Sequence, residues 1–89
     1  MVTSIILLNI ERNKVNNVAE QLAGMNEVSE VFSVSGHYDL VAIVRVPEND
    51  ALSEFVTKHL VGIQGIVKTD TMLAFKAYSK HDLESMFAM

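Results

Sequence analysis

Residues 34–46 read VSGHYDLVAIVRV, in which a short polar turn leads into an apolar stretch that ends just before Pro47. Glycine and aspartate are favoured in tight turns, and a run of β-branched and aliphatic residues closed by proline is typical of a strand. From 27 to 35, apolar and polar side chains alternate. The pattern therefore predicts a hairpin of two strands, 27–35 and 40–46, joined by a turn at 36–39.

Outward from this hairpin, the hydrophobic pattern predicts two further strands and two helices. Segments 2–10 and 66–78 are rich in β-branched and aliphatic residues, which is typical of strands. Apolar residues recur at helical spacing in segments 15–22 and 52–60, so each is expected to form an amphipathic helix. A short helix is also expected over 82–89, with its apolar positions at Leu83, Met86 and Phe87.

The same hydrophobic pattern predicts the positions of individual side chains in these elements. Asp50 is a plausible N-cap of the second helix, and the apolar stripe of that helix includes His59. In the strand before the turn, strict alternation puts Val28 and Phe32 on one face and Val31 on the other.

The expected order of elements is β-α-β-β-α-β, whose simplest arrangement with right-handed crossovers is the ferredoxin-like α+β fold. The first and third strands then lie at the centre of the sheet, and both helices cover the same face. The other face stays uncovered, and exposed apolar patches of this kind usually mark interfaces. We therefore expect a homodimer of the dimeric α+β barrel type, in which two sheets pack face to face. The residues expected at this interface are Ile5, Leu7, Val41 and Ile43.

Length and composition restrict the chemistry. The chain has 89 residues, no cysteine and three histidines. This length fits one domain over 1–89, and the lack of cysteine excludes disulfides, thiolate metal sites and cysteine nucleophiles. His37, His59 and His81 match no metal-binding spacing, and no nucleotide-binding fingerprint is present, so neither a metal nor a cofactor is expected.

Charge and hydropathy bear on partners and location. The formal net charge of -4 opposes the attraction to phosphates that supplies most nonspecific nucleic-acid binding. RNA-recognition domains of the same strand order stack bases on aromatic residues of their central strands, and the expected central strands contain none. The longest apolar run, 5–8, is too short for a membrane span and lacks the charged start of a signal peptide. We therefore expect a cytoplasmic chain with no direct nucleic-acid or membrane partner.

Two segments, VSGHYDLVAIVRV (34–46) and GIVKTDTMLAFKAY (65–78), resemble the effector-binding domain of the Lrp/AsnC (leucine-responsive regulatory protein) family. This domain is also called the regulation of amino-acid metabolism (RAM) domain. In that family a G-x-Y-D turn precedes an apolar strand and a helix, and the final strand carries a T-x-T element. The matching residues are Gly36, Tyr38, Asp39, Thr69 and Thr71.

The resemblance implies a function in transcriptional regulation of amino-acid metabolism. It implies dimers that assemble into octamers or related rings and bind an amino-acid effector between dimers. Full-length members carry an N-terminal helix-turn-helix, whereas this sequence starts at the first strand of the effector domain. A stand-alone member that could co-assemble with full-length Lrp/AsnC regulators is therefore expected.

The chemistry of an amino acid fits these residues. Its carboxylate is best met by backbone N–H groups and hydroxyls, and its ammonium by a carboxylate in a partly dry site. Gly36 permits close backbone approach, Thr69 and Thr71 offer hydroxyls, and Asp39 could pair with the ammonium. Tyr38 belongs to the same set, and its ring would pack at an interface. Each residue also has an ordinary role, because these types are common in turns and strands.

Two other interpretations remain open from the sequence. Small dimeric α+β barrel enzymes share this strand order, and in such an enzyme His59 or Arg45 would be the candidate functional groups. The third interpretation is a purely structural assembly domain with an empty site.

Overall fold

The computed structural model describes residues 1–78 and contains a four-stranded antiparallel sheet. Its strands are β1 (Val2–Ile10), β2 (Val28–Ser33), β3 (Leu40–Val46) and β4 (Ile66–Ala74), in the spatial order β2-β3-β1-β4. Because β1 and β3 lie at the centre, the predicted ferredoxin-like α+β fold is confirmed. The helix expected over 82–89 lies outside the described residues.

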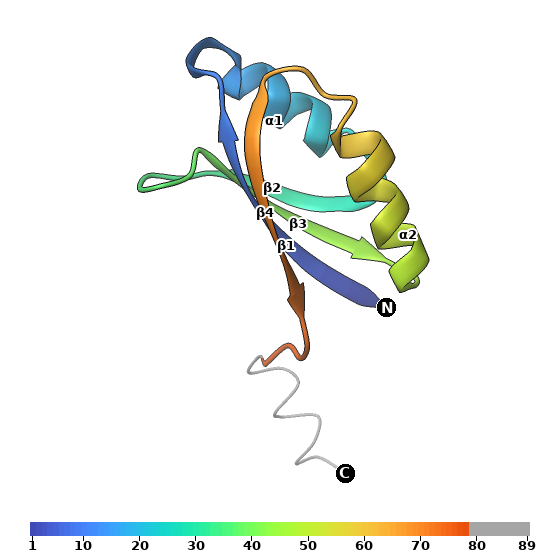
Figure 1. The fold of residues 1–89 in the computed structure, drawn as a ribbon. Helices are drawn as coiled ribbons and strands as arrows, with labels where there is room; N and C mark the ends of the chain where they lie inside the picture. The colour runs from blue at the N-terminus through green and yellow to red at the C-terminus, as the bar shows by residue number, and fades with distance from the viewer. Residues whose placement is uncertain (79–89) are drawn as a thin grey trace.

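Two helical segments pack on one face of the sheet, as Figure 1 shows. The first is α1 (Val15–Ala23), which follows a 3₁₀ turn, η1 (Arg12–Lys14). The second is α2 (Asn49–Glu54), which continues into a π-helix, η2 (Phe55–Leu60). The opposite face of the sheet carries no helix within residues 1–78.

The core lies between the sheet and the helices. Alternate residues of the two central strands are buried, from Ser4 to Ile10 in β1 and from Leu40 to Val46 in β3. The one buried polar side chain in the described part, Ser4, donates its hydroxyl hydrogen to the Met72 carbonyl at 2.8 Å. The apolar core residues are Ile6, Leu8, Ile10, Val18, Leu22, Val28, Leu40, Ala42, Val44, Val46, Phe55, Leu60 and Ile63.

The predicted division of β2 between the two faces is wrong because this strand contains a bulge. The register of β2 against β3 shifts between Val28 and Glu30, where one extra residue is inserted. Val28 and Val31 therefore both pack against the core. Phe32 lies on the uncovered side, opposite Val41, with 47% of its surface exposed.

The apolar stripe expected over 52–60 differs in the structure because its second half is a π-helix, η2. In a π-helix the backbone hydrogen bonds join residues five positions apart, which brings Phe55 and Leu60 to the same buried face. This wider winding leaves His59 at the surface, where its Nδ1 lies 3.3 Å from Oε2 of Glu27. The stripe is therefore correct for the two apolar residues and wrong for the histidine.

Two expected boundaries also differ. Glu48 is the N-cap of α2, and Asp50 lies in the first turn, where its carboxylate interacts favourably with the helix dipole. β4 ends at Ala74 instead of continuing to Tyr78. Its neighbour in the sheet is β1, which begins at Val2, so no pairing partner within residues 1–78 remains for the later positions.

Gly65 lies where the loop before β4 approaches the start of α1. Its φ is +106°, and a Cβ atom there would lie 3.0 Å from Cδ and 3.1 Å from Cβ of Lys14. We therefore expect Gly65→Ala to lower the free energy of unfolding by about 1–3 kcal/mol. Gly62→Ala is the matched control, because its φ is not positive and its nearest neighbour would be 3.5 Å away. Denaturant titration followed by circular dichroism measures both, and equal losses would contradict this account.

Candidate functional site

The uncovered side of the sheet carries a continuous apolar patch. Ile5 pairs with Ile43 and Leu7 pairs with Val41 across the two central strands, and all four side chains are half-buried by their neighbours. Sequence reasoning missed two further members, Phe32 on β2 and Met72 on β4, which are 47% and 45% exposed. We call this patch the open sheet face; it consists of Ile5, Leu7, Phe32, Val41, Ile43 and Met72.

The hairpin turn between β2 and β3 is tied to the end of β1 by hydrogen bonds. The Asp39 N–H donates to the Leu8 carbonyl at 2.9 Å, and Oδ2 of Asp39 accepts from the Ile10 N–H at 2.8 Å. The side-chain amide of Asn9 donates to the His37 carbonyl at 2.7 Å. Asp39 is therefore a fixed residue whose carboxylate both anchors the turn and carries a negative charge.

Gly36 begins this turn with a φ of +111°, a conformation that favours glycine. No heavy atom of the described residues lies within 4 Å of the position that a Cβ would take. Glycine is therefore favoured at this position by the backbone conformation and not by crowding. The space beside Gly36 is open to close approach by another group.

Tyr38 links the turn to the edge strand. Its hydroxyl donates a hydrogen bond to Oδ2 of Asp70 on β4. This hydrogen bond, together with desolvation and the negative charge of Asp70, raises the pKa of the Tyr38 phenol above its usual 10.0. The sequence did not indicate Asp70 as a partner, because 32 positions separate the two residues.

The raised pKa of Tyr38 predicts alkaline behaviour. Because folding favours the protonated phenol, this contribution to stability is complete below the unfolded pKa of about 10 and is lost as pH rises through the folded pKa. We expect the melting temperature of the wild type to fall more steeply above pH ~10 than that of Tyr38→Phe. Tyr78→Phe is the matched control and should behave as the wild type. Parallel alkaline slopes for Tyr38→Phe and the wild type would contradict this role.

The two threonines of β4 lie on the helix side of the sheet. Thr69 pairs with Leu8 and Thr71 with Ile6, both core residues, whereas Asp70 pairs with Leu7 of the open sheet face. Tyr38 of the hairpin turn meets β4 at Asp70, which lies on the opposite side of the sheet from both threonines. One chain therefore does not gather the five ligand-binding candidates, Gly36, Tyr38, Asp39, Thr69 and Thr71, around one cavity.

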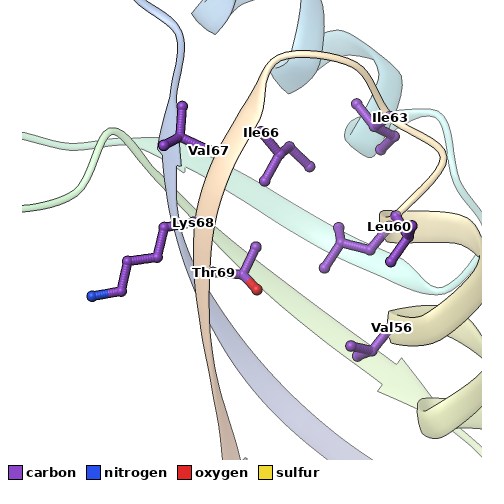
Figure 2. Close-up of a pocket in the computed structure, with 8 residues that line it drawn as sticks. Val56, Leu60, Ile63, Ile66, Val67, Lys68 and Thr69 are labelled. Atoms are coloured by element: carbon purple, nitrogen blue, oxygen red, sulfur yellow. The ribbon is translucent and has the colours of Figure 1, made fainter.

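A groove of about 290 Å³ lies between η2 and the start of β4. Val56 and Leu60 lie on the η2 side of the groove, and Ile66 and Thr69 project from β4 toward them (Figure 2). The side chains of Val67 and Lys68 lie on the other side of β4, away from these residues (Figure 2). The sequence pattern indicated Thr69 but not the groove, because the groove depends on how η2 and β4 are placed relative to each other in the fold. We call this the η2–β4 groove; Val56, Leu60, Val61, Ile63, Ile66, Val67, Lys68 and Thr69 line it.

The two candidate residues of the enzyme interpretation lie on opposite sides of the sheet. Arg45 alternates with the buried residues of β3 and lies on the uncovered side, whereas His59 belongs to the helix layer and pairs with Glu27. Within residues 1–78, no three His, Asp or Glu side chains lie close enough together to hold a metal ion. No helix among these residues has the length and hydrophobicity needed to cross a membrane.

Comparison with known proteins relates this fold to one class. The family model of the Lrp/AsnC ligand binding domain matches residues 3–83. The uncharacterized HTH-type transcriptional regulator PF1231 of Pyrococcus furiosus is 36% identical over 72 residues, which are 81% of this chain and 49% of the relative. The chain spans about half the length of the curated relatives it matches.

Solved structures agree with this relationship. The crystal structure of TTHA0845 from Thermus thermophilus has a TM-score of 0.83 and 39% identity, covering 90% of this chain and 100% of that one. The regulator NMB0573 from Neisseria meningitidis, solved as an L-Met complex, shares the fold with a TM-score of 0.80 at 19% identity, covering 88% and 52%. The fold and these relatives define a ligand-binding domain of transcription regulators. The chain belongs to the Lrp/AsnC family, over its ligand-binding domain.

Proposed function

We propose that this chain is a non-enzymatic, cytoplasmic domain that binds a free amino acid as a regulatory effector and assembles through homodimers. The observation that carries the proposal is the fixed position of Asp39 in a chain of this family. One carboxylate oxygen is held by the Ile10 N–H, so the orientation of the negative charge is set before any ligand arrives. A carboxylate held in this way is suited to an ammonium group.

A site between subunits follows from the separation of the candidate residues. Within one chain, Tyr38 of the hairpin turn reaches β4 at Asp70 on the open side of the sheet, whereas Thr69 and Thr71 lie on the helix side. A neighbouring chain must therefore contribute if all the candidates contact one ligand. The open sheet face supports the first level of assembly, because burying two such faces against each other removes apolar surface from water. Octamers or related rings of these dimers would then bring hairpins and β4 strands of different chains together.

Two further features support this proposal. The regulator from Neisseria meningitidis, which has the same fold, was solved as a complex with an amino acid, L-Met. The placement of Arg45 and His59 on opposite sides of the sheet gives no support to an enzyme built on these two groups. Full-length Lrp/AsnC regulators are the proposed protein partners, through co-assembly by the same face.

Calorimetric titration of the full chain with individual L-amino acids tests the proposal. Saturable binding of at least one amino acid is the expected result. A chain that assembles but releases or absorbs no heat with any of them would instead be a structural assembly domain.

A further inference from the structure

We propose that residues 82–89 pack as an amphipathic helix against the C-terminal end of β4, on the helix side of the sheet of their own chain. The surface that receives them contains Val2 of β1 and Leu73 of β4, with Phe75 just beyond the strand. We call this surface the β4 shelf. The inference concerns the packing of this chain and is independent of the proposed effector binding.

Within residues 1–78, the helices leave the β4 shelf uncovered. α1 packs against β2 and β3, and α2 packs against β1 and β3, whereas β4 packs extensively only against β1. Leu73 pairs with the buried Ser4, which places it on the helix side, yet 46% of its surface is exposed. Phe75 is 96% exposed. Apolar surface therefore remains in water where a third helix would lie beside α2.

The end of the chain carries a segment that matches this surface. The sequence predicts a helix over 82–89, with Leu83, Met86 and Phe87 on one face. An isolated helix of this length is not stable in water, so it needs an apolar surface to pack against. The family match ends at residue 83, so Met86 and Phe87 lie beyond the part that the family model covers.

The length of chain after β4 suits docking within one molecule. The chain leaves β4 at the end of the sheet where β1 begins, as Figure 1 shows. The nine steps from Leu73 to residue 82 span at most about 30 Å, enough to turn and return to the β4 shelf. A helix over 82–89 is about 12 Å long. Ile66, at the other end of β4, lies about 23 Å from Leu73, so the docked helix stays clear of the η2–β4 groove.

Tethering favours this segment over a separate molecule as the occupant. A short flexible linker holds its end at an effective concentration in the millimolar range. A second copy of the chain or another protein has to compete with that concentration from solution. The segment of the same chain is therefore the occupant that the β4 shelf fits best.

A single tryptophan tests the docking. The chain contains no tryptophan, so Phe87→Trp gives a full chain whose indole emission reports on this segment alone. We expect emission at a shorter wavelength than that of the same chain in denaturant, together with protection from quenching by acrylamide. Emission and quenching equal to those of the denatured chain, in a protein that circular dichroism shows to be folded, would overturn the inference.

A charge on the β4 shelf tests where the segment docks. Adding Leu73→Asp to Phe87→Trp should shift the emission to the wavelength of the denatured chain and abolish the protection, because the carboxylate would lie under the apolar face of the helix. Val67→Asp is the matched control. Val67 is 67% exposed and lies on the same strand, about 20 Å from Leu73, so the emission should stay unchanged. Equal effects of the two substitutions would contradict docking on the β4 shelf.

Mixing of two variants distinguishes docking within one chain from docking between chains. The double variant Leu73→Asp, Phe87→Trp is refolded from denaturant with an excess of Phe87→Asp, which keeps the β4 shelf intact and leaves it without its own segment. Docking within one chain predicts that the emission stays at the wavelength of the denatured chain. A return to the shorter wavelength would show that the segment docks on a neighbouring chain and would overturn the inference.

Discussion

Leu7→Asp should convert the assembled chain into monomers. Leu7 lies at the centre of the open sheet face, opposite Val41. In a face-to-face dimer, twofold symmetry would bury two unpaired carboxylates at once, and each buried unpaired charge costs several kcal/mol. At about 1.4 kcal/mol per factor of ten, the dimer dissociation constant should rise by at least about 1,000-fold. Sedimentation velocity at micromolar concentration measures this change.

The control for Leu7→Asp is a carboxylate on the other side of the molecule. Thr57→Asp, exposed on η2, should sediment as the wild type does. Because Leu7→Asp could also reduce folding, dilution of the wild type gives an independent readout. Its melting temperature should increase with protein concentration, as expected when assembly stabilises the folded chain. A folded wild-type monomer that persists at every concentration would contradict the interface.

Asp39→Asn should weaken amino-acid binding while the fold stays intact. The amide oxygen of asparagine can still accept the hydrogen bond from the Ile10 N–H, so the anchor of the turn survives. The negative charge is lost, and removal of one partner of a buried charge pair typically costs about 2–5 kcal/mol. The expected loss of affinity is therefore about 30-fold to several thousandfold, measured by calorimetry.

Asp39→Ala separates the structural role of this residue from its binding role. It removes both the charge and the acceptor for the Ile10 N–H, so it should lose about 1–3 kcal/mol of stability in addition to affinity. Denaturant titration should therefore place Asp39→Asn near the wild type and Asp39→Ala below it. Equal amino-acid affinity in wild type and Asp39→Asn would remove Asp39 from the site and leave it as a turn residue alone.

The order of the strands and helices could be predicted from the sequence because, in most of each element, apolar residues recur at the spacing typical of a strand or of a helix. The two-sided apolarity of segments 2–10 and 40–46 identified the central strands, which the sheet confirms. The errors occur where the period changes. The bulge after Val28 shifts the alternation of β2, and the π-helix replaces a spacing of four residues by five, which exposes His59.

The site was less predictable than the fold because it depends on contacts between distant residues. The turn motif identified Asp39, but not the Ile10 N–H that fixes its carboxylate 29 positions away. Alternation placed Thr69 and Thr71 on one face of a strand, but it did not show which face would carry the helices. The η2–β4 groove needs two elements whose relative placement is a property of the whole fold.

Native mass spectrometry of the full chain, with and without a mixture of L-amino acids, tests the central claim most directly because it reports assembly and ligand mass together. Our account predicts even-numbered assemblies whose mass increases, when the mixture is present, by that of an amino acid for up to one site per chain. A folded monomer with no added mass in the presence of the mixture would contradict it.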